Sequence, residues 1–365
     1  MQAVLDELVD TIRAAGMNKQ PLRFRGGGTK DFFGQTLVGR TVDTRSYAGI
    51  IDYDPAELVI TARCGTPLEE VEAVLAERGQ CLPFEPPHFV DGPNQSGATI
   101  GGAFAAGLSG PRRQSVGALR DFVLGAQLVD GNGHILNFGG QVMKNVAGYD
   151  VSRLLAGSLG TLGLVTEVSL KVLPIPVASV TLEFQMDQDA AMRLFNKCSG
   201  QPLPIAATAW FEGTALMQLS GARAAVNAAK KKLGGQELSD RMARQQWDGF
   251  RNQTHDFFLR HRSEPLWRIA VPPVAPPLHL PGEQMIEWGG GQRWWIAPDS
   301  AEFTCERVRR AASESGGHAT LFRNGEKSTG VFTKLSASIW AVHKRLKSTF
   351  DPHNIFGLDR MYAGL

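Results

Sequence analysis

Glycine residues gather in three short segments of this chain, and each segment could bring the backbone close to a ligand. Glycine accounts for 41 of the 365 residues. The segments cover residues 25–30, 97–107 and 157–163. Because glycine has no side chain and adopts positive φ at little cost, consecutive glycines let several backbone N–H groups point at one anion. The chemistry that these segments predict is phosphate binding by backbone amides.

The first segment does not fit the two best-known phosphate loops. A dinucleotide-binding turn has the pattern G-x-G-x-x-G, but Asp31 stands where the third glycine would be. A Walker loop, G-x-x-x-x-G-K-[ST], is absent as well. Each segment alone could be an ordinary tight turn. Three of them between residues 25 and 163 favour one extended ligand touched at several points, and a dinucleotide joined by a pyrophosphate has that length.

Short strands and helices must position these segments. An Asp-Gly-Asn-Gly turn at residues 130–133 predicts a hairpin between its flanking strands. Apolar and polar side chains alternate over residues 164–172, which is typical of a half-buried strand. Thr66 is expected to cap a helix that begins at Pro67. Strands are predicted at residues 22–25, 58–62, 122–129, 134–138 and 164–172.

The order of the elements predicts an α+β fold and argues against a doubly wound parallel sheet. We expect a ligand-binding domain over residues 1–174, itself built from two α+β subdomains. The pattern changes after Pro174, and residues 175–332 predict a second α+β unit that acts as a cap or substrate domain. Residues 333–365 predict a helical tail that packs back toward the first domain.

Composition narrows the function classes. The formal net charge is +2, from 38 basic and 36 acidic residues, and no one-signed patch indicates nucleic-acid binding. No run approaches the ~20 apolar residues of a membrane span. The four cysteines are widely spaced, so the sequence predicts neither a disulfide frame nor an iron–sulfur cluster in this chain. These features predict a cytoplasmic protein, held at the inner membrane, if at all, through a complex.

The motifs taken in order resemble one flavoprotein family. Arg-Gly-Gly-Gly-Thr, Ala-Thr-Ile-Gly-Gly and Gly-Ser-x-Gly-Thr-x-Gly are similar to the FAD-binding domain of the vanillyl-alcohol-oxidase/PCMH-type family, over residues 19–174. Phe-Asp-Pro at 350–352 and Ile-Phe-Gly at 355–357 resemble the closing motif of its lactate and glycolate dehydrogenase branch. Residues 142–150 and 266–272 are similar to the smaller flavin subunit of multi-subunit members of that branch.

The resemblance implies FAD as the cofactor. Covalent members often place His directly after the glycine run, where this chain has Thr29, so we expect non-covalent FAD. The implied cofactor-binding residues are Arg25, Gly26, Gly27, Gly28, Thr29, Lys30, Gly97, Ala98, Thr99, Gly101, Gly102, Gly107, Ser158, Gly160, Thr161, Gly163 and Val165.

The resemblance also implies a reaction, the oxidation of glycolate or a similar small 2-hydroxy acid to the oxo acid, here glyoxylate. The implied partners are a catalytic FAD-binding 2-hydroxy-acid dehydrogenase subunit and an iron–sulfur subunit. Guanidinium is the best clamp for the substrate carboxylate because its fork is bidentate. Arg268 is the first candidate and Arg323 the second, with Arg293 and Lys334 as further cations, and a structural salt bridge is the alternative for Arg268.

Catalytic relatives carry metal-binding histidines in two stretches, and this chain lacks the histidines in both. The corresponding stretches are residues 288–295 and 325–330, where Gly290 and Lys327 stand at the expected ligand positions. We therefore expect no metal, and His318 alone makes no site. Two hypotheses follow. Either the FAD of this chain is an electron relay or structural cofactor and a partner oxidises the substrate, or the chain is a stand-alone dehydrogenase of an acid such as D-lactate.

Overall fold

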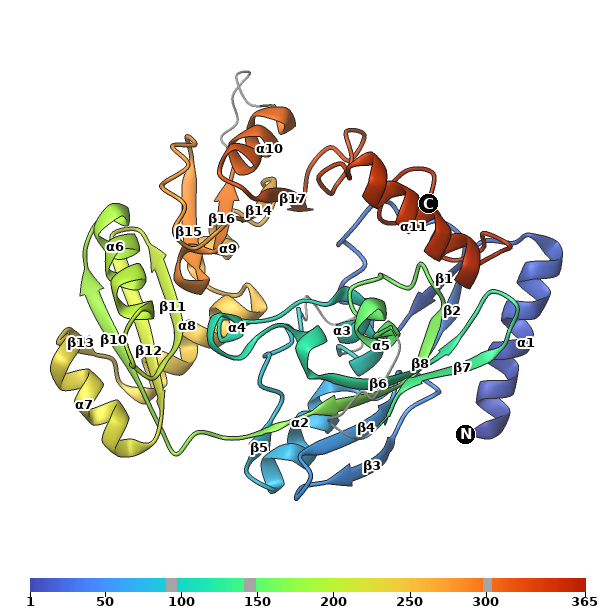
Figure 1. Cartoon of the computed structure of the whole chain (residues 1–365), viewed down its shortest axis with the longest axis horizontal. Helices are drawn as coiled ribbons and strands as arrows, with labels where there is room; N and C mark the ends of the chain where they lie inside the picture. Colours follow the sequence, from blue (N-terminus) through green and yellow to red (C-terminus); the bar gives the residue numbers. More distant parts are fainter. Residues whose placement is uncertain (90–96, 141–148, 298–303) are drawn as a thin grey trace. The chain divides into compact units, whose positions relative to one another are not determined.

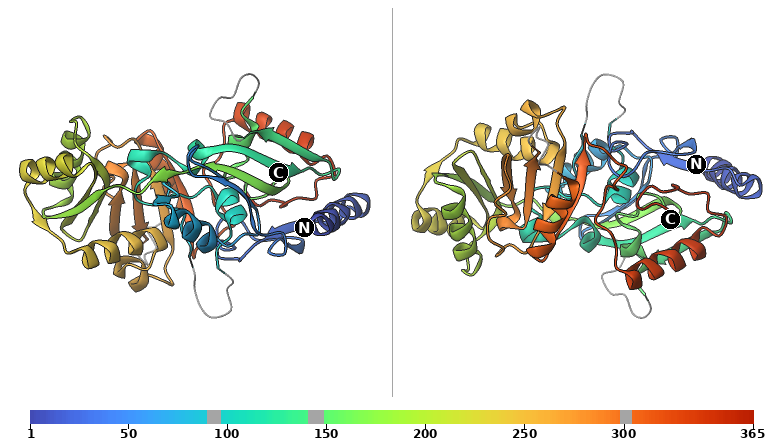
Figure 2. Two further views of the ribbon diagram at one scale, coloured as in Figure 1. Left: turned by 90° about the horizontal axis from the view of Figure 1, so that it is seen from below. Right: turned by 90° about the horizontal axis from the view of Figure 1, so that it is seen from above.

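The computed structural model describes residues 1–89, 97–140, 149–297 and 304–365, which form two units (Figures 1 and 2). The first unit contains Met1–Ser109, Ala118–Pro174 and Lys334–Leu365. The second contains Gly110–Gly117 and Ile175–Thr333. The chain therefore leaves the first unit for eight residues and returns, well before it enters the main part of the second unit.

A five-stranded antiparallel sheet forms the centre of the first unit. β6 and β7 are joined through the turn at 130–133, with Val129 opposite Ile135, so the predicted hairpin is confirmed. β8 is the middle strand and is buried on both faces, so the expectation of a half-buried strand is wrong. Its polar residues bond across the sheet instead, as between Ser169 and Thr61 hydroxyls 2.8 Å apart. The strand order is β3 (Ile50–Asp54), β4 (Val59–Arg63), β8 (Leu164–Lys171), β6 (Val123–Val129) and β7 (Ile135–Gly139).

A second, smaller layer carries the first glycine segment. β1 runs parallel to β2, and the apolar face of α1 packs on them through Leu8, Ile12 and Leu22. α2 begins at Leu68, and no side chain caps it. The Thr66 hydroxyl instead donates to the Arg63 carbonyl and accepts from the Gly49 N–H, so the expected Thr66 cap is wrong. The remaining elements are α1 (Gln2–Asn18), β1 (Leu22–Arg25), β2 (Arg40–Asp43), α2 (Leu68–Glu77), β5 (Gln80–Cys81), α3 (Ile100–Ala106), η1 (Leu119–Phe122), α5 (Val151–Leu155), β9 (Leu173–Pro174) and α11 (Ala337–Phe350).

The C-terminal helix α11 belongs to this unit and lies beside β7, where Phe350 meets Phe138 edge-on at 6.1 Å (Figure 2). Its one buried charge is Lys347, whose ammonium donates to the carbonyls of Thr161 at 2.9 Å and Phe356 at 2.5 Å. The third donor meets the Asp351 carboxylate at 2.8 Å. Burial lowers the pKa of Lys347, and Asp351 opposes that effect.

The second unit is built on an eight-stranded antiparallel sheet. α6 and α7 cover β10 and β12 through Leu182, Phe195 and Val226, and α10 packs on the strands around Trp267 and Trp295. The sheet order is β13 (Gln236–Glu237), β10 (Ala178–Gln185), β12 (Thr214–Gly221), β11 (Ile205–Phe211), β15 (Glu283–Glu287), β16 (Gln292–Ile296), β14 (Leu266–Ala270) and β17 (His318–Arg323). The helices are α4 (Arg113–Val116), α6 (Gln188–Ser199), α7 (Arg223–Leu233), α8 (Asp240–Asn252), α9 (Asp256–Arg260), η2 (Trp288–Gly290) and α10 (Cys305–Glu314).

Among the described residues, no helix combines the length and the apolar character needed to cross a membrane. A cytoplasmic location, or one at the inner membrane through a complex, stays a prediction.

Lys347→Met should lower the thermal denaturation midpoint of the first unit by at least about 6 °C, measured by calorimetry. Breaking a buried ion pair costs about 3–5 kcal/mol, and in a unit of this size 1 kcal/mol corresponds to about 2–4 °C. Lys344→Met, on the exposed side of the same helix, is the control and should shift the midpoint by less than about 2 °C. Equal shifts in both variants would contradict the structural role of Lys347.

Candidate functional site

The first glycine segment leaves β1 at Arg25 and turns at once against α3. A Cβ atom on Gly26 would lie 2.2 Å from the Thr99 hydroxyl, so no side chain fits between the two segments. Gly28 has φ of 76°, a conformation that side chains other than glycine rarely adopt. The Thr99 hydroxyl accepts from the Gly102 N–H at 3.2 Å and so begins α3. The first and second predicted loops therefore touch each other.

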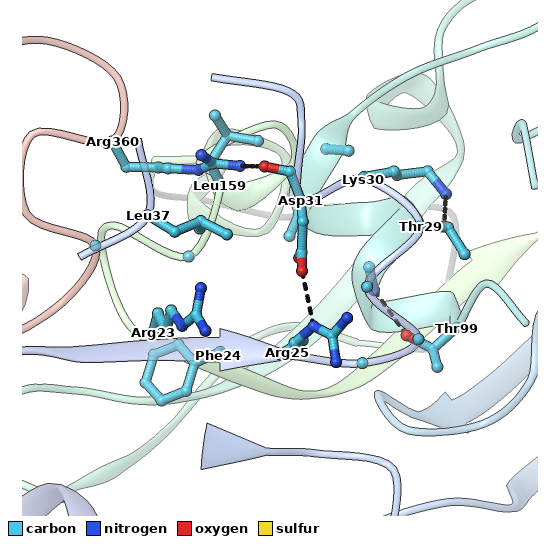
Figure 3. A pocket seen from close by; sticks show the side chains of 18 of the residues that line it. Arg23, Phe24, Arg25, Thr29, Lys30, Asp31, Leu37, Thr99, Leu159 and Arg360 are labelled. Atoms are coloured by element: carbon cyan, nitrogen blue, oxygen red, sulfur yellow. Dashed lines mark hydrogen bonds and ion pairs between the residues drawn. The ribbon is translucent and has the colours of Figure 1, made fainter. Parts of the chain in front are cut away.

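Several positive charges surround this loop (Figure 3). Arg25 Nε donates to Asp31 Oδ2 at 2.8 Å, and Lys30 Nζ donates to the Thr29 hydroxyl at 3.2 Å. Arg360 is 6% exposed and donates to the backbone carbonyls of Asp31, at 3.0 Å, and Gln35. Burial lowers the pKa of Arg360 to about 10, although Asp31 opposes this shift. It stays charged at neutral pH, and the wall of the site is cationic.

A pocket of about 760 Å³, open to solvent, lies between these groups. All three predicted glycine segments and the chain after α11 contribute to its wall. The lining residues are Arg23, Phe24, Arg25, Gly26, Gly27, Gly28, Thr29, Lys30, Asp31, Leu37, Val38, Thr99, Gly102, Ala105, Ala106, Leu159, Gly160, Gly357, Leu358 and Arg360.

A second pocket of about 460 Å³ shares seven of these residues and extends toward the start of β8. Its further walls are largely apolar and include Cys64 and Leu164. Burial raises the pKa of the Cys64 thiol to about 12, so the sulfur is a neutral surface. The lining residues are Phe24, Arg25, Gly26, Thr44, Cys64, Gly101, Gly102, Ala105, Ser158, Leu159, Gly160, Gly163, Leu164 and Val165.

The third glycine segment packs by backbone contact against the second segment and against β6. A Cβ atom on Gly107 would lie 2.8 Å from the Gly157 Cα, and one on Gly163 would lie 2.7 Å from the Val129 carbonyl oxygen. Leu159 and Gly160 both have positive φ, 54° and 73°. The segment therefore turns sharply between α5 and β8 and presents backbone to both pockets.

Most of the predicted cofactor residues line one pocket or the other, but five need comment. Gly101 lines the second pocket, yet it must be glycine because a Cβ atom would lie 2.6 Å from the Cys64 Cβ. Among the described residues, Gly97, Ala98, Gly107 and Thr161 line neither pocket. Ala98 accepts from Leu68 N–H, and Thr161 accepts from Lys347, so both hold the loops in place. Residues 142–150, the segment similar to the smaller flavin subunit, fall largely outside the described residues.

Sequence reasoning missed the contributions of Cys64, Leu37 and Arg360. Cys64 comes directly after β4, and its place is set by the pairing of β4 with β8. Arg360 follows the Phe-Asp-Pro and Ile-Phe-Gly motifs, which were the available signal for this region. Leu22 and Phe356 form a parallel bridge, and this bridge brings the tail to the first loop.

In the second unit the structure separates the candidate cations. Arg293 is fully buried and donates to the carbonyls of Ala275 and Pro276 at 2.7 Å, so it holds the proline-rich loop. Arg323 lies at the opposite end of β17 from His318 and bonds to the Phe258 carbonyl at 3.5 Å. Arg268 lies in the middle of β14, the strand next to the β17 edge of the sheet, beside Trp288. Lys334 is exposed and belongs to the first unit.

The two stretches that lack histidines, residues 288–295 and 325–330, form two different local structures. Residues 288–290 form a 3₁₀ turn, in which a Cβ atom on Gly290 would lie 2.6 Å from the methyl of Met192. Glu326 is exposed and accepts from the Ser328 N–H at 2.8 Å. In the part of the chain that the structure describes, no three His, Cys, Asp or Glu side chains could hold a metal ion together. The expectation that this chain binds no metal stays a prediction.

Comparison with known proteins bears on these pockets. A sequence model described as "FAD binding domain" matches residues 4–139. "Glycolate oxidase subunit GlcE" of Escherichia coli K12 is 45% identical over 358 residues, which cover 98% of this chain and 97% of that protein. The chain belongs to the GlcE family of FAD-binding proteins.

More distant relatives share one part of the chain or the fold alone. "Glycolate oxidase subunit GlcD" of Bacillus subtilis is 33% identical over 179 residues, which cover 48% of this chain and 37% of GlcD. The solved structure of an alkyldihydroxyacetonephosphate synthase has a TM-score of 0.64 at 16% identity, and the match covers 96% of this chain and 73% of that one. The predicted α+β fold with a PCMH-type FAD-binding domain is thereby confirmed.

The pockets of this GlcE-family chain fit FAD. The glycines of the first two loops, which lie where a Cβ atom would collide with neighbouring residues, leave backbone N–H groups open to a ligand. The positive charges around Asp31 suit the negative charge of a pyrophosphate. Arg23, Arg25, Lys30 and Arg360 carry four positive charges against the one negative charge of Asp31. The apolar second pocket suits an aromatic ring system. FAD as the cofactor, predicted from the sequence, is confirmed by the family.

Gly28→Val should reduce FAD occupancy by more than about tenfold, since valine resists positive φ and would displace the loop from the phosphates. Gly213→Val is the matched control. Gly213 also has positive φ, 81°, but it lies at a hairpin in the second unit with no atom within 4 Å of a Cβ. Occupancy is measured from the flavin-to-protein absorbance ratio. Similar FAD loss in both variants would show that general strain, not the loop, decides binding.

Acid precipitation should release the flavin of the wild-type protein into the supernatant. The side chain after the glycine run is Thr29, which is 5% exposed and is bonded to Lys30, and a threonine hydroxyl offers no imidazole for attachment. The measurement is flavin fluorescence of the supernatant and of the washed pellet. Flavin retained in the pellet would contradict non-covalent binding.

Proposed function

We propose that this chain is the FAD-binding subunit of a multi-subunit glycolate oxidase, which converts glycolate to glyoxylate. The observation that carries the proposal is the 45% identity to a glycolate oxidase subunit over nearly the full length of both chains. The cationic, glycine-lined pockets support FAD binding by this chain itself. The proposed partners are a catalytic FAD-binding 2-hydroxy-acid dehydrogenase subunit and an iron–sulfur subunit.

The flavin of this chain is proposed to relay electrons or to stabilise the assembly, while a partner oxidises the substrate. Glycolate must lose two electrons and two protons to become glyoxylate, and a base or metal has to take the hydroxyl proton. Lys327 and Gly290 stand where the family resemblance implies metal ligands, and an ammonium group repels a divalent cation. These residue types favour oxidation elsewhere in the assembly.

The residues of the first unit have defined tasks in this proposal. Backbone N–H groups of the first two loops would bind the pyrophosphate, and Arg25, Lys30 and Arg360 would balance its charge. Bound FAD supplies a two-electron acceptor. Cys64 stays protonated and provides an unreactive apolar wall, because burial raises the pKa of its thiol. The alternative, a stand-alone dehydrogenase of D-lactate or a similar acid, requires a substrate to reduce this flavin directly.

Glycolate added anaerobically to the isolated, FAD-loaded chain should leave its flavin oxidised for minutes. When the catalytic and iron–sulfur partners are added, the same glycolate should bleach the flavin. The measurement is stopped-flow absorbance of the oxidised flavin, with D-lactate run in parallel. Rapid bleaching of the isolated chain by either acid would make it a dehydrogenase in its own right and would contradict the relay role.

A further inference from the structure

Strand register in the second unit collects polar groups on one face of the sheet. Residues directly opposite one another in an antiparallel pair point to the same face. One row across β15, β16, β14 and β17 is Glu287, Gln292, Ala270 and His318. The adjacent row on the same face is Met285, Trp294, Arg268 and Thr320. Ala270, which has the smallest side chain of its row, lies between Gln292 and His318, and Arg268 lies on the same face two residues earlier in β14.

The guanidinium of Arg268 is held in place from one side. Its Nε donates to Gln292 Oε1 at 2.6 Å, and Gln292 Nε2 donates to Glu287 Oε2 at 3.0 Å. Trp294 Nε1 also donates to Glu287 Oε2, at 2.6 Å. Glu287 is 2% exposed, so its carboxylate is a fixed acceptor. Within the described residues, the two terminal nitrogens of Arg268 make no hydrogen bond, and the side chain is half-buried.

A second guanidinium shares the same indole ring. Arg113 Cζ lies 4.6 Å from the centre of the Trp288 ring, and Arg268 Cζ lies 5.3 Å from it. Trp288 Nε1 donates to the Gly110 carbonyl at 3.1 Å, which fixes the ring. Arg113 comes from α4, whose Gln114 accepts from the Thr208 hydroxyl at 2.7 Å. Two guanidinium groups thus lie beside one indole ring, and one of them, Arg268, is linked through Gln292 to a buried carboxylate.

We propose that Arg268 and Arg113 form a binding site for a small carboxylate on this face, with Gln292 and His318 beside it. The terminal nitrogens of a guanidinium match a carboxylate in a bidentate geometry, and Arg268 has both of them available. Tryptophan packing orients both forks and lowers the entropy lost on binding. The identity of the acid, glycolate or its oxidised form glyoxylate, rests on the proposed function.

The charges of the site agree with an anion as the ligand. Burial lowers the pKa of Arg268 to about 10, Arg113 adds to this effect, and Glu287 opposes it. Although His318 stays accessible to solvent, desolvation and the charges of Arg268 and Arg113 lower the pKa of its imidazole. His318 is therefore neutral at neutral pH and can exchange a hydrogen bond with a hydroxyl or oxo group on the ligand.

Titration calorimetry of the FAD-loaded chain with glycolate tests the site. Arg268→Gln and Arg113→Gln should each weaken binding at least about tenfold, as expected for loss of a charged hydrogen bond. Arg309→Gln is the matched control, because Arg309 lies 5.6 Å from the ring of Trp267 on the opposite face of the same sheet. Its affinity should equal that of the wild type. Ethylene glycol, which lacks the carboxylate, should not bind.

The outcomes separate the site from the proposed function. Binding of D-lactate or phosphate in place of glycolate, lost in both site variants, would support the anion site and count against glycolate as the substrate. Glycolate binding that persists in Arg268→Gln and Arg113→Gln would overturn the site and leave the function standing. Failure of the wild type to bind any of these anions at millimolar concentration would also overturn the site. Circular dichroism checks that each variant is folded.

Discussion

The cofactor site depends on close backbone contact between three loops that are far apart in the sequence. Gly26 meets Thr99, Gly107 meets Gly157, and Gly163 meets the Val129 carbonyl, each at a distance that excludes a Cβ atom. Cationic side chains and pocket walls are arranged around these contacts. At Gly107 and Gly163 the atoms in the way belong to the backbone, so no rotamer change can relieve a larger residue there. The pockets are therefore a property of how the loops pack together, and no single loop makes them.

The C-terminal segment fastens this arrangement through one fully satisfied ammonium group. The three donors of Lys347 meet Thr161, Phe356 and Asp351, and the Asp351 carboxylate also accepts from the N–H groups of Ile355 and Phe356. A buried charge pair contributes little net stability compared with apolar side chains of the same size, but it holds the segments that carry it in one orientation. Here it sets the tail in register with the third glycine loop, and so places Arg360 at the first.

Local patterns in the sequence predicted the elements and loops, whereas long-range register decided the rest. The turn at 130–133 has its own conformational preference, and the glycine segments need no partner to be recognised. The burial of β8, the bonds of the Thr66 hydroxyl to Arg63 and Gly49, and the roles of Cys64 and Arg360 follow from strand pairing between distant segments. Arg113 is a similar case. It lies in a sequence that gives no reason to separate it from its neighbours, and its place beside Trp288 depends on the brief passage of the chain into the second unit.

The division of the chain also sets an order of events during synthesis. The first unit contains both ends of the chain, and Gly357, Leu358 and Arg360 line its larger pocket. A ribosome has therefore made all of the second unit before the residues that complete the cofactor pocket exist. Domains generally fold in the order in which they emerge, N-terminal first. In this chain the wall of the cofactor pocket is complete only once residues 357–360 have been made, and a chain that stops short of residue 357 lacks part of that wall.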